Sequence, residues 1–116
     1  MSIIIVREGI TKKELADMAK DQFGDWVKAV VDIEKAIMAV GGDLHADEEA
    51  ALIDDGSTQQ NCWGVNLWFE KEGDELVEFN SMINIRPSAG NRTRDVENQE
   101  IRKKIKKVVS QLVNVP

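Results

Sequence analysis

Two neighbouring segments, residues 61–70 and 75–86, constrain the fold of this chain most strongly, because apolar residues alternate with other residues along both. The odd-numbered apolar positions are Trp63, Val65, Leu67, Phe69, Val77, Phe79, Ile83 and Ile85. A period of two is typical of strands that bury one face. We therefore predict an antiparallel hairpin that directs its odd-numbered side chains into the core.

The connection between these two strands sets their register. A three-residue loop over 72–74 places Leu67 opposite Phe79, and antiparallel partners share a face. The even-numbered face then brings together the pairs Asn66 with Asn80, Cys62 with Asn84, and Trp68 with Glu78, with Gln60 and Arg86 at the far end. The sequence thus predicts a polar sheet face that is rich in amide side chains.

Helices are predicted near both ends of the chain. The β-branched run at 2–8 favours a buried strand, and Thr11 with Glu14 forms a capping box for a helix that reaches about Phe23. Asn98 is an N-cap for a final helix. The apolar stripe of that helix is Ile101, Ile105, Val108, Val109 and Leu112.

Residues 26–42 fit both a helical and a strand period. β-Branched residues dominate there, so we favour a strand hairpin that turns near residues 34–36. Asp25 as an N-cap and Gly41 as a C-terminal cap favour a helix instead. Further on, residues 50–53 lead into the turn sequence 54–57, which predicts another hairpin.

The elements together predict one α+β domain over residues 1–116. Its order is β-α-β-meander-α, with a mainly antiparallel sheet and an N-terminal and a C-terminal helix packed on one face. A chain of 116 residues can bury a core without a metal or a disulfide. No dinucleotide or phosphate-loop motif is present in the sequence, so no cofactor is expected.

The net charge and the cysteine content limit the kinds of partner and the cellular location that we expect. The net charge of −6 makes nucleic-acid binding an unlikely role, although basic residues crowd the stretch 86–107. No apolar run reaches the length of a membrane span. The single cysteine cannot form an intramolecular disulfide, and the N-terminus lacks the features of a secretory signal. We therefore expect a cytoplasmic protein.

Several segments resemble a family of small prokaryotic proteins known only as a domain of unknown function. They are the residues LHADEE at 44–49, WGVNL at 63–67 and SMINIRPSAGNR at 81–92, together with the shorter DIE at 32–34. The resemblance covers nearly the whole chain. It implies a prokaryotic cytoplasm and brings no activity, ligand or catalytic residue with it.

The loop after the second strand is a candidate anion site. Its guanidinium, hydroxyl and amide groups belong to Arg86, Ser88, Asn91, Arg92 and Arg94. Arginine offers paired donors that match phosphate or carboxylate, and glycine lets backbone amides turn inward. The alternative is a solvated loop whose arginines pair with Asp95, with Glu97 or with the acidic stretch at 43–55.

One imidazole and four carboxylates lie between residues 43 and 49. On a strand, Asp43, His45, Asp47 and Glu49 share one side and are candidates for acid–base work or for a metal ion. The spacing matches no calcium or zinc pattern, so no metal is assigned, and an exposed polar segment is the alternative. Cys62 has no basic neighbour in sequence, so we interpret it as a packed residue.

Two functional hypotheses follow. In the first, the chain is a non-catalytic interaction module, a homo-oligomer that associates through Trp68, Asn66 and Asn80; a covering segment of the chain is the alternative for this face. In the second, Arg86, Asn91 and Arg92 hold a small anionic ligand while His45 and nearby carboxylates supply acid–base or metal chemistry. The second requires residues 43–49 and 86–94 to converge in space.

Overall fold

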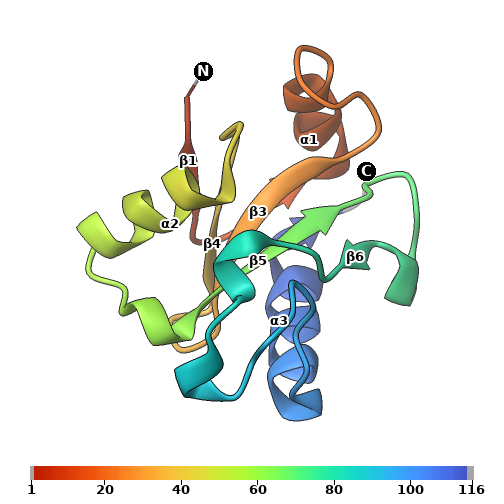
Figure 1. Cartoon of the computed structure of the whole chain (residues 1–116). Coiled ribbons are helices and arrows are strands. Elements are labelled where there is room, and N and C mark those ends of the chain that lie inside the picture. Colours follow the sequence, from red (N-terminus) through yellow and green to blue (C-terminus); the bar gives the residue numbers. More distant parts are fainter. Residues whose placement is uncertain (1, 115–116) are drawn as a thin grey trace.

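A five-stranded antiparallel sheet is the centre of the computed structural model, which describes residues 2–114 (Figure 1). Its strands lie in the order β1-β4-β3-β5-β6. They are β1 (Ile4–Val6), β4 (Ile37–Val40), β3 (Val27–Asp32), β5 (Cys62–Leu67) and β6 (Val77–Glu78). The two longest strands, β3 and β5, are neighbours in the middle of the sheet.

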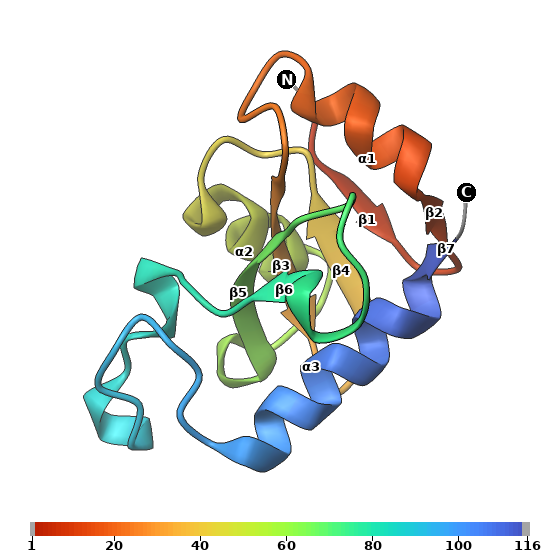
Figure 2. The ribbon, with the colours of Figure 1, turned by 90° about the vertical axis from the view of Figure 1, so that its right-hand side faces the viewer.

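Three α-helices cover the two faces of this sheet (Figures 1 and 2). They are α1 (Lys12–Ala19), α2 (His45–Asp54) and α3 (Gln99–Leu112). Helices α1 and α3 pack on one face and α2 on the other. The predicted α+β class, with an antiparallel sheet and helices near both ends, is confirmed. None of the helices between residues 2 and 114 is long and apolar enough to cross a membrane.

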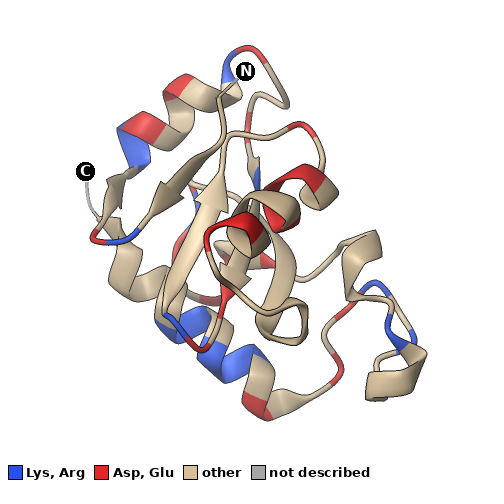
Figure 3. Cartoon of the chain, turned by 90° about the vertical axis from the view of Figure 1, so that its left-hand side faces the viewer, with Lys and Arg blue, Asp and Glu red and all other residues tan. Residues whose placement is uncertain are grey.

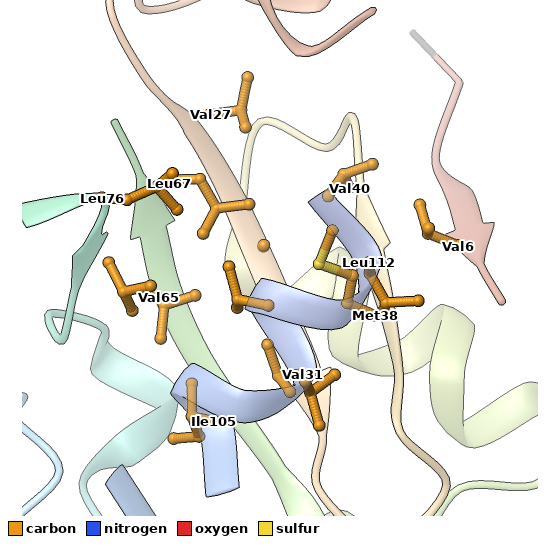
Figure 4. Packing of buried hydrophobic residues seen from close by; sticks show 14 of the residues in the cluster. Val6, Val27, Val31, Met38, Val40, Val65, Leu67, Leu76, Ile105 and Leu112 are labelled. Carbon is orange, nitrogen blue, oxygen red and sulfur yellow. The ribbon is translucent and has the colours of Figure 1, made fainter. Parts of the chain in front are cut away.

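The main core lies between the sheet and helices α1 and α3. Odd-numbered residues of β3 and β5 point into it, as the alternation predicts, and Trp63 is buried there. Figure 4 shows part of this core, with Val31, Val65 and Leu67 of the sheet beside Ile105 and Leu112 of α3. A smaller cluster between the sheet and α2 consists of Val30, Ile37, Ala39, Leu52 and Cys62. Most of the apolar burial, and so most of the hydrophobic stabilisation, comes from the first face.

The predicted helix caps are present. The Glu14 amide donates to Thr11 Oγ1 at 3.1 Å, and the Thr11 amide donates to Glu14 Oε1 at 3.1 Å. Helix α1 nevertheless ends at Ala19, before Phe23, because Gly24 turns the chain with a φ of 84°. For α3, Asn98 Oδ1 accepts two amide hydrogen bonds from the first turn.

Residues 26–42 form the predicted strand hairpin. Strands β3 and β4 are paired up to Asp32 and Ile37. Asp32 Oδ1 accepts hydrogen bonds from the amides of Glu34 and Lys35 at 2.8 and 3.0 Å, which closes the turn. The helical alternative for this segment is wrong. The β-branched residues favour the two strands, and the hydrogen bonds to Asp32 favour the turn between them.

The hairpin predicted at residues 50–57 is wrong, since residues 45–54 form helix α2. Its buried positions are His45, Glu48 and Leu52, at helical spacing. The sequence at 54–57 ends this helix: Gly56 has a φ of 111°, and the Ser57 amide donates to the Leu52 carbonyl at 2.9 Å. A strand with Asp43, His45, Asp47 and Glu49 on one side does not exist.

A two-stranded parallel pair, absent from the sequence prediction, joins the beginning of α1 to the end of α3. Its strands are β2 (Ile10–Thr11) and β7 (Val113–Asn114). The pair places the residues around Lys12 beside the last turn of α3. This arrangement contributes to the cleft described below.

The second strand of the predicted hairpin is much shorter than 75–86. Strand β6 has two residues, and Leu67 pairs with Val77 where the sequence predicted Phe79. The three-residue loop is also wrong, because the loop extends to the hydrogen bond from the Trp68 amide to the Leu76 carbonyl at 2.8 Å. A shift of two residues preserves the parity of each face, so the even-numbered face remains polar.

Beyond residue 80 a side chain replaces the predicted strand. The Gly64 amide donates to Asn84 Oδ1 at 2.8 Å, and Asn84 Nδ2 donates to the Gly64 carbonyl at 2.9 Å. The intervening 3-10 turn is Met82–Asn84. A Cβ on Gly64 would lie 2.5 Å from Ser81 Oγ, so only glycine permits this approach. Asn84 therefore pairs with Gly64, and the predicted pairing with Cys62 is wrong.

We predict that Asn84→Ala lowers the free energy of unfolding by about 3 kcal/mol, because it leaves the buried amide and carbonyl of Gly64 unpaired. The control is Asn98→Ala, which removes a solvent-exposed helix cap and should cost about 1 kcal/mol. Urea unfolding measures both. Equal losses in the two variants would contradict a special role for Asn84.

Candidate functional site

A polar row crosses three strands on the sheet face that carries α2. Lys28 on β3 is paired with Asn66 on β5, and Asn66 is paired with Glu78 on β6. Asn66 Nδ2 donates to Glu78 Oε1 at 2.9 Å, and Trp68 Nε1 donates to the same oxygen at 3.2 Å. Two of the predicted interface residues, Asn66 and Trp68, thus share one carboxylate.

Three aromatic rings lie beside this row. Phe23 stacks on Trp26 with 4.2 Å between centroids, and Trp26 stacks on Trp68 at 5.9 Å. The ammonium of Lys28 lies 5.8 Å from the Trp26 centroid, and that of Lys71 lies 5.4 Å from the Trp68 centroid. We call these five residues the aromatic surface. All three rings are half-buried, so each keeps area for contact.

His45 enters the same face from the first turn of α2. Its Nε2 lies 2.8 Å from the Val65 carbonyl, so Nε2 carries the proton that is donated. Burial lowers the pKa of His45 to about 4, and the nearby charges of Lys28 and Arg94 act in the same direction. His45 is therefore a neutral donor at pH 7.

Glu48, one turn further along α2, is completely buried. The Gly42 amide donates to Glu48 Oε2 at 3.0 Å. Burial raises the pKa of Glu48 to about 9, so the carboxyl group is protonated at neutral pH. Within residues 2–114, Glu48 Oε1 and Asn66 Oδ1 have no hydrogen-bond partner. This side of the sheet therefore carries uncompensated polar atoms under α2.

The acidic residues predicted to act with His45 are dispersed by the helix. Asp43 and Asp47 are exposed, whereas Glu49 turns towards Arg86. The part of the chain that the structure describes contains no group of three or more histidine, cysteine, aspartate or glutamate side chains placed to hold a metal ion. Acid–base or metal chemistry at these residues stays a prediction.

The side chain of Arg86 is largely buried. Its Nε donates to the Ile83 carbonyl at 3.1 Å, Nη2 donates to the Cys62 carbonyl, and Nη2 lies 3.4 Å from Glu49 Oε2. The guanidinium also lies 4.6 Å from the centroid of Trp63. Burial lowers the pKa of Arg86, while Glu49 acts in the opposite direction. The side chain holds the 81–86 segment against β5.

Asn91 is buried and organises the loop that follows. Its Nδ2 donates to the carbonyls of Asn84 and Asp95, each at 2.7 Å, and its Oδ1 accepts from the Glu97 amide at 2.8 Å. Ser88 and Arg92 are exposed. Binding of an anion by this loop stays a prediction, but the side chains of three of its five residues, Arg86, Asn91 and Arg94, already make internal hydrogen bonds.

Segments 43–49 and 86–94 converge, as the ligand hypothesis required. Glu49 and Arg86 join them directly, and the charge of Arg94 reaches His45. Arg94 Nε also donates to Asn80 Oδ1 at 2.7 Å, which brings the third predicted interface residue to the rim of the polar row. The meeting point of Glu49 and Arg86 is largely buried.

Sequence reasoning missed Phe23, Trp26 and Lys28 as members of this site. Lys28 and Trp26 are even-numbered, and the even-numbered side chains of β3 lie on the same sheet face as Asn66 and Trp68. The available signal was therefore the alternation itself, combined with the antiparallel pairing of β3 and β5. Cys62 is buried, as predicted, and burial raises its pKa to about 11.

Comparison with known proteins identifies the family. The chain belongs to the family described as "Protein of unknown function (DUF5674)", whose sequence profile matches residues 4–112. No curated protein and no solved structure matches the chain. The family resemblance seen in the sequence is thus confirmed as a domain of unknown function, and the fold described above is the basis for proposing a role.

We predict that Glu48→Gln stabilises the protein above pH 6.5. The unfolded carboxyl ionises near its ordinary pKa of 4.5 while the folded one stays protonated to about pH 9. The unfolded state therefore binds fewer protons, and wild-type stability falls as pH rises, by about 1.4 kcal/mol per unit. His45, with its folded pKa of about 4, opposes this slope only below pH 6.5.

Urea unfolding at three pH values between 6.5 and 8.5 measures this slope. Glu48→Gln should remove most of it, whereas Glu34→Gln, in the exposed β3–β4 turn, should leave it unchanged. A variant at residue 48 with the wild-type slope would mean that Glu48 is ionised in the folded protein.

Proposed function

We propose that this domain is a non-catalytic interaction module that associates with a second copy of itself through the aromatic surface. The observation that carries the proposal is the stack of Phe23, Trp26 and Trp68. These half-buried rings come from two separate segments and are held in order by stacking and by the bond to Glu78. Aromatic residues that are pre-ordered at a surface are typical of interface centres.

The state of the reactive side chains supports binding over catalysis. His45 is neutral at pH 7 and its Nε2 hydrogen is bonded to a backbone carbonyl. Cys62 is buried and its raised pKa of about 11 leaves almost no thiolate at neutral pH. His45 and Cys62, the side chains best suited to act as a general base and as a nucleophile, are therefore held in their less reactive forms.

A second copy suits the charges around the rings. A two-fold interface places one patch against the same patch, so the patch must complement itself. Lys28 and Lys71 lie over the rings, while Asp25 and Glu70 precede Trp26 and Lys71 in sequence and are exposed. In a two-fold dimer, the lysines of one copy can pair with the carboxylates of the other while the aromatic rings of the two copies stack. The aromatic surface is thus compatible with its own copy.

We predict that the protein shows a concentration-dependent monomer–dimer equilibrium and that Trp68→Ala weakens it about tenfold or more, the effect of losing one interface hot spot. Sedimentation velocity across protein concentration measures the dissociation constant. Trp26→Ala should act in the same direction, because Trp26 is the central ring of the stack.

The control is Met82→Ala, which removes an apolar side chain that is 64% exposed on a different part of the surface. Its dissociation constant should equal that of the wild type. Thermal unfolding of each variant checks that the fold is retained. A protein that stays monomeric at the highest concentrations, or a dimer that Met82→Ala weakens and Trp68→Ala does not, would overturn the proposal.

A further inference from the structure

A cleft of about 700 Å³ lies between α3 and the segment 72–77, next to the beginning of α1. Figure 2 shows the connection from β5 to β6 beside this helix. Leu76 and Val77 line the cleft from the sheet side, and Val109 and Val113 line it from the end of α3. Its volume is in the range of small-molecule sites, and these residues give it an apolar floor.

The rim of the cleft is basic. It is lined by Lys12, Lys103, Lys106 and Lys107, and by the carboxylates of Glu72 and Asp74, which leaves a net charge of +2. The whole chain carries −6. Figure 3 shows lysines and arginines gathered along α3. A local positive field over an apolar floor selects for an anion with an apolar part.

The rim lysines differ in how far they are already engaged. Lys106 Nζ is paired with Asp74 at 3.0 Å, and Lys12 Nζ donates to the Lys71 carbonyl at 3.3 Å. Lys103 pairs with Glu100 at 3.5 Å, on the exposed side of the helix. Within residues 2–114, the ammonium group of Lys107 has no hydrogen bond or ion pair, although its carbonyl accepts one from Ser110 Oγ. It is therefore the cation best placed to accept a new partner.

We propose that this cleft binds a small amphiphilic anion, a carboxylate with a short or medium alkyl chain. Lys103 and Lys107 are four residues apart and lie on neighbouring turns of one helix face, where both ammonium groups can approach one carboxylate. The negative end of the α3 dipole disfavours an anion at the last turn. The head group accordingly lies beside Lys103 and Lys107, and the alkyl chain lies over Val109 and Val113.

The ligand class is tested with a series of straight-chain carboxylates. Acetate, butanoate, hexanoate and octanoate, each below its micellar range, are titrated into the labelled protein and followed by amide-correlation NMR. Affinity should rise by about fourfold per methylene buried until the cleft is filled. The neutral alcohol 1-octanol should bind more weakly than octanoate. Equal affinity for acetate and octanoate would overturn the proposal.

The site is tested with charge variants on the same protein. Lys107→Gln should weaken octanoate binding by about threefold, the effect of one partly exposed ion pair. Asp74→Asn should strengthen binding by a similar factor, because it releases Lys106 and removes a negative charge from the rim. The matched control is Lys104→Gln, on the same helix but outside the cleft. Equal weakening by Lys104→Gln, or weaker binding in Asp74→Asn, would overturn the assignment.

Discussion

The antiparallel ladder between β3 and β5 is the constraint on which the rest of the structure depends. It joins six residue pairs, from Val27 with Leu67 to Asp32 with Cys62. Because side chains alternate along a strand, this register sends the odd-numbered residues of both strands to the main core and the even-numbered ones to the face that carries α2. A slip by one residue would turn Lys28 and Asn66 towards α3 and move the apolar set to the face that carries α2.

The even-numbered face differs from an ordinary second core because polar groups are buried in it. Glu48 is neutral, Asn84 takes the place of a strand, and Asp32 closes a turn while accepting a hydrogen bond from Ser57. Each of these groups makes at least one hydrogen bond to a neighbouring segment, and these bonds help to fix how α2 and residues 81–97 lie on the sheet. Arg86 adds a buried cation to the same layer.

Sequence reasoning succeeded where local period and capping determine structure, as in α1, α3 and the β3–β4 hairpin. It failed at α2 because two of its three buried positions are His45 and Glu48, so a hydrophobic period is missing from the sequence. It failed after residue 80 because the side-chain amide of Asn84 pairs with the backbone N–H and carbonyl of Gly64, as a neighbouring strand would. No periodicity of backbone or side chains signals such a substitution.

The candidate surface was partly within reach of the sequence. Trp68, Asn66 and Asn80 follow from the alternation on 61–70 and 75–86, even though the predicted register was two residues from the observed one. Trp26 and Phe23 required the non-local pairing of β3 with β5, which local patterns do not supply. The cleft could not be predicted from local patterns at all, because its walls come from three distant parts of the chain. They are α3, the 72–77 segment and the β2–β7 pair at the beginning of α1.

The connection between β5 and β6 belongs to both surfaces. Trp68 and Lys71 lie on the aromatic surface, while Asp74 and Leu76 line the cleft. Strand β6 has only two residues, so strand pairing holds this connection weakly. The Trp68 amide donates to the Leu76 carbonyl at 2.8 Å, and Leu76 and Val77 are buried in the main core. Two exposed contacts add to these: the pairing of Lys106 with Asp74 and the bond from Lys12 to the Lys71 carbonyl. A ligand bound in the cleft would therefore lie against the same connection that carries Trp68 on the aromatic surface.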